Sequence, residues 1–328
     1  MNEKTARQIE NMKHDYNFGV EVEMNHITRQ KAAQVTAEYF GTGRYENTAF
    51  RNGYQTWSSW DQQGREWKFQ RDCSIKGPDD EKCELVTPVL LWQDIEPFLE
   101  LLRQLRHAGM RSSPARGCGV HVHVGLMGTD GRDHDAKSLR NLVNIMASHE
   151  RLIGRAIKID EGRTDNYCRL VDPDFLERVN RQKPKTMVKL ANCWYEGNHA
   201  SSGRGSHYND SRYHFTNLHP GLSWVLGYRD HSKPTVEFRG YQFRDPHDGR
   251  LGGIDAREMR AYIHLSLAIS ELAKEVAYAS PKPQQTENDA FAFRTWMCRL
   301  GFIGEEFAMT RKVLLANLEG NCAWRHAC

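Results

Sequence analysis

Short segments in which apolar and polar residues alternate recur along the chain and predict β-strands whose two faces differ in polarity. The polar positions are Glu21 and Glu23 in residues 18–24, His121 and His123 in residues 117–125, and Glu237 and Arg239 in residues 235–241. Because successive side chains of a strand point to opposite sides, each pair shares one face. Histidines on a half-exposed strand often have no function, so the pattern gains meaning only from the acidic strands that accompany it.

A fourth strand is predicted over residues 83–86, where Glu84 precedes a short apolar run that Pro88 ends. It forms a hairpin with a strand at residues 67–69, through a turn at residues 76–80. Like charges on one sheet face repel each other, and burying them unpaired costs several kcal/mol. Such a face is tolerable chiefly if cations neutralise it, and carboxylates with few histidines favour Mg²⁺ or Mn²⁺ over structural zinc.

Apolar residues spaced three and four apart predict amphipathic helices. They cover about residues 28–40, 95–108, 139–153 and 262–276, and the chain beyond Pro281 is also predicted to be helical. Thr28 is a suitable N-cap and Gly109 a suitable stop. Residues 1–15 are expected to be an arm or frayed helix, and residues 44–64 and 196–211 to be loops. Trp57, Trp60, Trp194 and Tyr208 in or beside these loops either select the substrate or serve local packing.

The acids come from both ends of the chain and no internal repeat is present, so we expect one domain. Its core would cover about residues 17–280, with a helical extension at about 281–328. The 45 Lys and Arg residues nearly balance the 42 Asp and Glu residues, so the charge demands neither nucleic acid nor a membrane surface. The oligomeric state is left open.

No apolar run reaches about 18 residues, and residues 1–4 do not begin a signal peptide. We therefore expect a cytoplasmic protein without a membrane partner. The eight cysteines are scattered, which argues against a zinc knuckle and a disulfide framework. Cys118, inside the histidine strand, is interpreted as a small buried residue rather than a nucleophile.

Five blocks in this order resemble the amidoligase family, which is related to glutamine synthetase and glutamate–cysteine ligase. The blocks are Phe-Gly-Val-Glu-Val-Glu at 18–23, Asp-Cys-Ser at 72–74, Glu-Leu-Val-Thr-Pro at 84–88, Cys-Gly-Val-His-Val-His at 118–123 and Thr-Val-Glu-Phe-Arg at 235–239. The resemblance covers residues 17 to about 245. It implies an α+β fold with a glutamine synthetase-like curved, largely antiparallel sheet and helices packed on one face.

The resemblance also implies roles for individual residues. The metal ligands would be Glu21, Glu23, Glu84, His121 and Glu237. His123 and Arg239 would contact nucleotide phosphates, Arg212 would meet the transferred phosphoryl group or the carboxylate, and Asp72 would support the site. Glutamine synthetase has a second isolated glutamate that has no counterpart here; Asp72 is the candidate substitute, and the number of metal ions stays open.

The implied function is an ATP- and Mg²⁺-dependent, ADP-forming carboxylate–amine ligase that works through an acyl phosphate. Its partners would be small-molecule or peptide carboxylates and amines, whose identity the sequence does not reveal. The chain has no P-loop motif and no evident nucleophilic triad.

Three alternatives remain open. A phosphotransferase can use the same type of sheet, and a non-catalytic module with a decayed site would keep only binding. A metal-dependent hydrolase would combine His121 and His123 with one further histidine, namely His199, His207, His214 or His219.

Overall fold

The computed structural model describes residues 3–51, 53–196, 203–228, 234–245, 252–283 and 286–323. The helices in these residues are α1 Glu3–His14, α2 Arg29–Tyr39, α3 Ile95–His107, α4 Ala136–Ile157, α5 Glu161–Asn166, α6 Pro173–Gln182, α7 Met187–Tyr195, α8 His219–Val225, α9 Ala256–Glu275, α10 Asp289–Arg299 and α11 Ala308–Leu315. The strands are β1 Phe18–Met24, β2 Tyr45–Asn47, β3 Trp57–Trp60, β4 Glu66–Gln70, β5 Cys83–Val86, β6 Val120–Gly125, β7 Thr216–Asn217 and β8 Thr235–Tyr241.

The eight strands form an antiparallel sheet in the order β2-β3-β4-β5-β1-β6-β8-β7. This confirms the expected mixture of helices with an antiparallel sheet, while the glutamine synthetase-like form of that sheet stays a prediction. The chain divides into two compact units. The sheet unit comprises Phe18–Val122 and Tyr241–Arg260, and the helical unit comprises Met1–Asn17, His123–Gly240 and Ala261–Cys328. Expecting one catalytic domain also stays a prediction.

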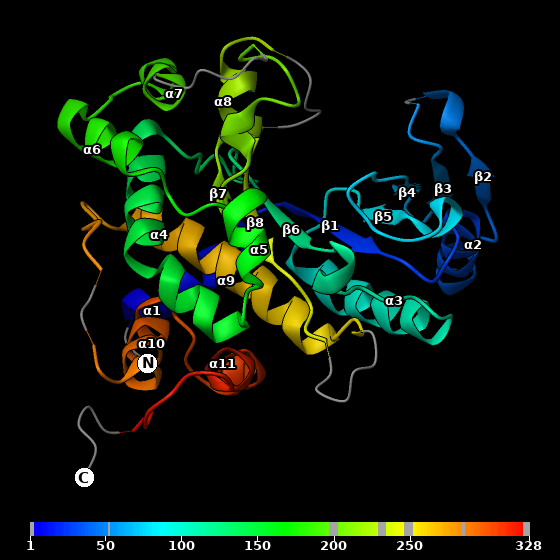
Figure 1. The fold of residues 1–328 in the computed structure, drawn as a ribbon. Helices are drawn as coiled ribbons and strands as arrows, with labels where there is room; N and C mark the ends of the chain where they lie inside the picture. The colour runs from blue at the N-terminus through cyan, green and yellow to red at the C-terminus, as the bar shows by residue number, and fades with distance from the viewer. Residues whose placement is uncertain are drawn as a thin grey trace. The chain divides into compact units, whose positions relative to one another are not determined.

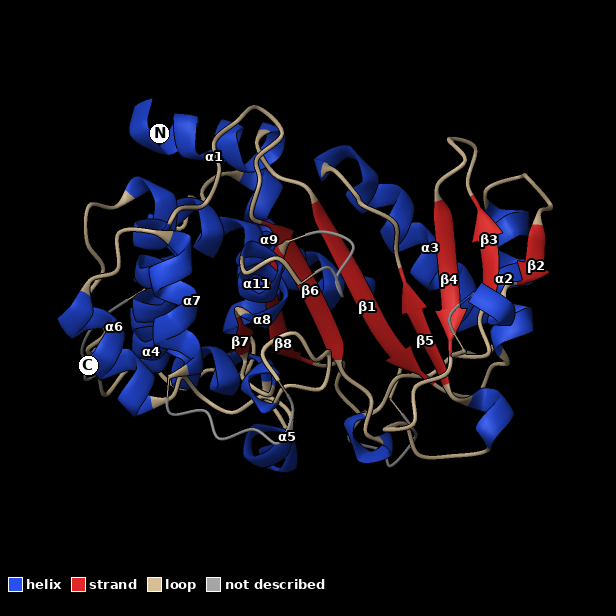
Figure 2. Cartoon of the chain, turned by 90° about the horizontal axis from the view of Figure 1, so that it is seen from above, coloured by secondary structure: helices blue, strands red, loops and turns tan. Residues whose placement is uncertain are grey.

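In the sheet unit, helices α2 and α3 cover one face of the strands, as Figure 2 shows. Alternate residues of β4 face them, and the Trp67 ring lies 6.0 Å from that of Phe98 in α3 and 5.1 Å from that of Phe40. Burying such large apolar side chains is the main contribution to the stability of a unit of this kind. Thr28 caps α2, as expected, by accepting a hydrogen bond from the Lys31 amide. The opposite face carries the polar residues, among them Glu23 and Glu84.

In the helical unit, α4 and α9 pack together, and Asn141 of α4 donates hydrogen bonds to the carbonyls of Ala273 and Val276. Figure 1 shows α9 as the long yellow-to-orange helix beside α4. Both helices were predicted from their apolar spacing. None of the described helices combines the length with the apolar character that crossing a bilayer requires.

Two sequence-based expectations about secondary structure need correction. Residues 3–14 form α1, which is held to α9 because Asn11 and Tyr16 bond to Glu271 at 2.7 and 2.9 Å. Residues 44–64 are not only a loop, since β2 and β3 lie within them. The segment Trp57–Trp60 lacks clear alternation, and it becomes a strand by pairing with β4. Of the expected loop at 196–211, residues 197–202 lie outside the described residues.

Candidate active site

Two carboxylates face each other across neighbouring strands of the sheet unit. Glu23 of β1 and Glu84 of β5 are direct partners in the antiparallel register, and each is 6% exposed. Gln70 of β4 lies opposite Glu84 on its other side and donates a hydrogen bond of 2.8 Å to its Oε2. The hairpin predicted from the sequence therefore places an amide, not a cation, next to Glu84.

His121 of β6 joins this cluster from the other side of β1. Its Nδ1 lies 2.9 Å from Oε2 of Glu21, and its Nε2 lies 3.9 Å from Oε1 of Glu23. The other oxygen of Glu23 accepts a hydrogen bond of 2.5 Å from the Gly119 amide. The alternation of β1 thus brings both acids to one face, as predicted, and His121 reaches both of them.

The surroundings of Glu84 disfavour its ionised form. Burial, followed by the charges of Glu21, Asp72 and Glu23, raises the pKa of Glu84 well above its usual value. The hydrogen bond from Gln70 acts in the opposite direction but is the smallest of these effects. Asp72, which follows β4, contributes its charge while its Oδ1 accepts from the Ser74 amide at 2.6 Å. A nearby like charge disfavours the ionised form of a carboxyl group, and burial acts in the same direction.

The residues present fit a divalent cation. One ligand atom each from Glu23, Glu84 and His121 lies within 4.8 Å of the others, and all three residues are buried. Two carboxylates and one imidazole suit Mg²⁺ or Mn²⁺ better than a soft metal.

A second group of predicted residues lies in the helical unit. Glu237 of β8 is 2% exposed, and its two oxygens are 2.6 Å from Nη1 of Arg239 and from Nδ2 of Asn217. Nε2 of His123 lies 3.8 Å from the same carboxylate, and its Nδ1 lies 3.2 Å from the Thr235 hydroxyl. The negative charge of Glu237, unlike that of Glu84, is compensated by a guanidinium.

Arg212 and Arg239 share one aromatic neighbour. Their guanidinium carbons lie 5.7 and 6.0 Å from the ring centroid of Tyr213. Arg212 is held in place because its Nη1 donates a hydrogen bond of 2.8 Å to the His207 carbonyl. The structure therefore brings these two predicted phosphate-binding residues to the same ring.

The other histidines considered for a hydrolase have local roles. Nδ1 of His219 lies 2.6 Å from the Tyr195 hydroxyl, and Nδ1 of His214 lies 3.0 Å from the Ser211 carbonyl. In the part of the chain that the structure describes, no metal-capable group includes His123 with either of them. His207 is T-stacked on Tyr208, and His199 lies outside the described residues.

Sequence reasoning missed Gln70, Asn217 and Tyr213. Gln70 and Asn217 act through strand register, since Gln70 pairs with Glu84 and Asn217 with Glu237. The pairing of Gln70 with Glu84 could have been counted from the predicted hairpin. The pairing of Asn217 could not, because β7 has only two residues and shows no alternation of apolar and polar side chains. Trp60 and Trp194 are buried, which fits local packing, and Cys118 is buried as expected.

Comparison with known families agrees with these observations. A family model described as "Putative amidoligase enzyme" matches residues 14–270. The chain therefore belongs to the amidoligase family, and a ligase-type enzyme is the class that this membership implies. No curated protein and no solved structure matches the chain.

Proposed function

We propose that the protein is an ATP- and Mg²⁺-dependent carboxylate–amine ligase that releases ADP, with Mn²⁺ able to replace Mg²⁺. The observation that carries this proposal is the buried cluster of Glu23, Glu84 and His121, with the half-buried Glu21 beside it, in a member of the amidoligase family. Carboxylate oxygens and an imidazole nitrogen this close together are ligands that a hard divalent cation accepts.

Within the sheet unit, Glu23, Glu84 and His121 would hold the ion, and Glu21 would orient His121 through its hydrogen bond to Nδ1. A bound divalent ion would offset the negative charge of the ATP phosphates. Asp72 would add negative charge at the edge of the cluster.

Within the helical unit, Arg239, Arg212 and His123 would contact the phosphates and the substrate carboxylate. Arginine suits this role because its planar fork matches phosphate and carboxylate oxygens and stays charged at any working pH. Glu237 and Asn217 would orient Arg239, because both bonds of the Glu237 carboxylate are short. The ligand role expected for Glu237 stays a prediction, and each oxygen of its carboxylate has a further lone pair beyond these two bonds.

The reaction follows from the chemistry of amide formation. A carboxylate oxygen attacks the γ-phosphorus of ATP, ADP leaves, and the carboxylate becomes an acyl phosphate. The amine then attacks the acyl carbon and phosphate leaves with the bridging oxygen. Arginines that meet the developing charge on the phosphoryl oxygens would lower the barrier by electrostatic stabilisation.

Thermal stability in the presence of nucleotide tests this proposal. Mg²⁺ and ATP together at about 100 times Kd should stabilise the protein by about 2.7 kcal/mol, which raises Tm by roughly 5 °C. Glu84→Gln should abolish the shift, and Glu46→Gln, on the exposed edge strand β2, should keep it. A wild-type Tm that is unchanged by Mg²⁺ with ATP would contradict the proposal and favour a hydrolase.

A further inference from the structure

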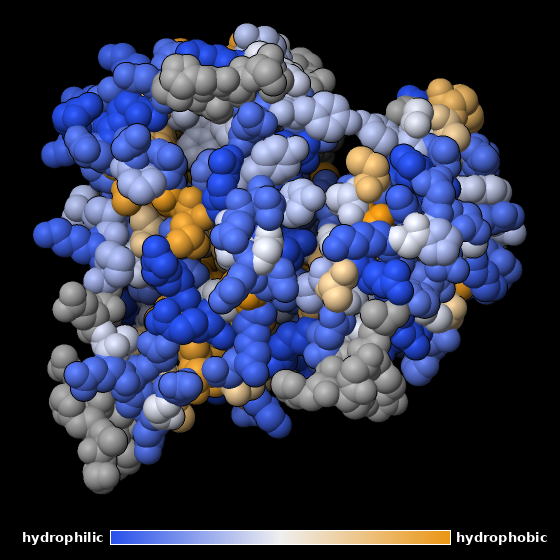
Figure 3. Space-filling view, in the orientation of Figure 1, coloured by the Kyte–Doolittle hydropathy of each residue, from blue (hydrophilic) through white to orange (hydrophobic). Residues whose placement is uncertain are grey.

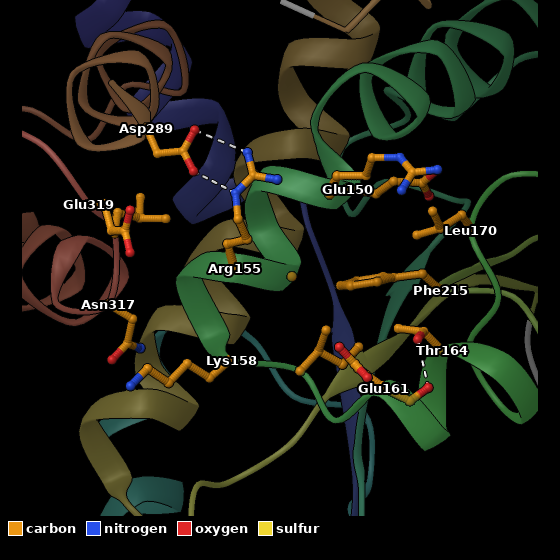
Figure 4. Close-up of a pocket in the computed structure, with 14 residues that line it drawn as sticks. Glu150, Arg155, Lys158, Glu161, Thr164, Leu170, Phe215, Asp289, Asn317 and Glu319 are labelled. Atoms are coloured by element: carbon orange, nitrogen blue, oxygen red, sulfur yellow. Dashed lines mark hydrogen bonds and ion pairs between the residues drawn. The ribbon is translucent and has the colours of Figure 1, made fainter. Parts of the chain in front are cut away.

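A pocket of about 580 Å³ lies in the helical unit, beside the last turns of α4. Its wall includes Glu150 and Arg155 of α4, Leu170, and Phe215, which precedes β7. Figure 4 shows Phe215 and Leu170 at one side and Arg155, bonded to Asp289, at the other. The volume is in the range of small-molecule sites.

This pocket lies on the other face of β8 from Glu237 and Arg239. Gly240 shares the strand parity of Val236 and Phe238, and a Cβ on Gly240 would lie 2.2 Å from the Phe215 ring. The ring therefore packs on the face opposite to the two charged residues. The pocket is thus distinct from the candidate active site.

Glu150 is the chemically distinctive group of the pocket. It is 4% exposed, and both of its oxygens accept from the amide of Val171 at 3.0 Å. Among the described residues, no side chain donates a hydrogen bond to this carboxylate. Burial raises the pKa of Glu150 to about 7, in spite of the nearby Arg151 charge.

Three further features favour a cation here. The pocket is lined by the carboxyl-terminal end of α4, a 22-residue helix whose dipole is negative at that end. Arg155 is engaged by Asp289, at 3.0 Å between Nη2 and Oδ1. The whole lining holds the four carboxylates of Glu150, Glu161, Asp289 and Glu319 against the three basic groups of Arg151, Arg155 and Lys158, so its formal charge is −1.

The remaining wall is apolar. Ile159, Leu170, Phe215 and Leu318 contribute hydrocarbon surface. In Figure 3, hydrophobic residues gather on the face of the molecule between α4 and α5, within a largely hydrophilic surround. An aromatic ring beside a carboxylate suits an ammonium ion that carries an apolar body.

We propose that this pocket binds a small organic ammonium ion, with its charged nitrogen at Glu150 and its hydrocarbon part against Phe215 and Leu170. The geometry that supports the proposal is a buried carboxylate with no cationic hydrogen-bond donor among the described residues, at the negative end of a long helix, inside an apolar cavity. The proposal does not depend on the ligase assignment.

Calorimetric titration of the full chain at pH 8 with 2-phenylethylammonium tests the site. We expect saturable binding with 1:1 stoichiometry and at least about tenfold weaker binding of the neutral analogue 2-phenylethanol, because a buried carboxylate strongly favours a charged donor. Glu150→Gln should weaken binding of the ammonium probe about tenfold or more. Glu161→Gln, which removes an exposed carboxylate from the same lining, should change it less than about twofold.

A second variant guards against misfolding of Glu150→Gln. Thr164→Trp, on the short helix α5, fills the cavity from its partly exposed side and should also abolish binding. Absence of wild-type binding at 10 mM probe, equal affinity for the alcohol, or unchanged binding by Glu150→Gln would each overturn the proposal.

Discussion

Replacing Glu84 with glutamine should stabilise the metal-free protein. The substitution keeps the size of the side chain and an oxygen that accepts from Gln70, but it removes one negative charge from a cluster that also holds Glu21, Glu23 and Asp72. Burial and these charges raise the pKa of Glu84. The folded protein therefore either keeps Glu84 protonated at a pH where the unfolded chain would ionise it, or bears the repulsion between the ionised carboxylates.

Coulomb's law gives the size of the stabilisation expected for Glu84→Gln. Two unit charges 4.8 Å apart, the outer limit for the ligand atoms of Glu23 and Glu84, repel by about 3 kcal/mol at an effective dielectric constant of about 20. We expect a gain of about 1–3 kcal/mol, because the protein relaxes around the charge.

The stability difference between Glu84→Gln and wild type depends on pH and on bound metal. A raised folded pKa adds no penalty below pH 4.5, where both states are protonated, and a penalty that grows as pH rises above it. Urea unfolding in EDTA should therefore show Glu84→Gln more stable than wild type at pH 7.5 and equal at pH 4. At about 100 times Kd of Mn²⁺, wild type alone should gain about 2.7 kcal/mol, so the advantage of the variant should shrink by that amount. A variant that is less stable than wild type in EDTA, or that gains as much stability from Mn²⁺ as wild type does, would refute this reasoning. Glu46→Gln should change the stability by less than about 0.5 kcal/mol throughout.

Three further predictions concern single substitutions. Glu23→Gln should abolish ATP turnover with its fold intact by circular dichroism; turnover at the wild-type rate would remove Glu23 from the metal set. Arg239→Lys should lower kcat at least about tenfold, because lysine lacks the planar guanidinium that can bond to Glu237 and to phosphate at once. Near-normal kinetics would mean that Arg239 only forms the ion pair with Glu237. Glu150→Gln should stabilise the protein by up to about 3 kcal/mol at pH 8 and not at pH 4, since the pKa of Glu150 is about 7 in the folded protein and 4.5 in the unfolded chain. Equal urea midpoints for variant and wild type at pH 8 would contradict the burial of this charge.

The pattern of the sequence predicted the strands that carry the charged residues, because alternation is a local property. The acids of β1 share one face, and Glu84 sits on the hairpin partner of β4, as expected. Partners from other strands could not be predicted in the same way. Alternation puts Arg239 on the face of Glu237, but Asn217, which also bonds to Glu237, comes from a strand of only two residues.

The α1 helix illustrates a second limit of sequence reasoning. Its few apolar residues give a weak signal, yet Ile9 and Met12 are buried and Asn11 bonds to Glu271, about 260 residues away in the chain. Tertiary contacts of this kind stabilise a helix beyond its local preference, which is why the sequence predicted only an arm or a frayed helix here. The pocket beside α4 was missed for the same reason, since its wall comes from five separate stretches of chain.

Transfer of an oxygen isotope tests the central claim most directly. If the substrate acid is activated as an acyl phosphate, one of its own oxygens bridges carbon and phosphorus and leaves with phosphate when the amine attacks. An acid labelled with ¹⁸O, identified by screening acid and amine pools for ADP release, should yield ¹⁸O-labelled inorganic phosphate together with ADP and the amide. Label in AMP, or unlabelled phosphate beside a genuine amide product, would contradict the proposed ADP-forming ligase mechanism.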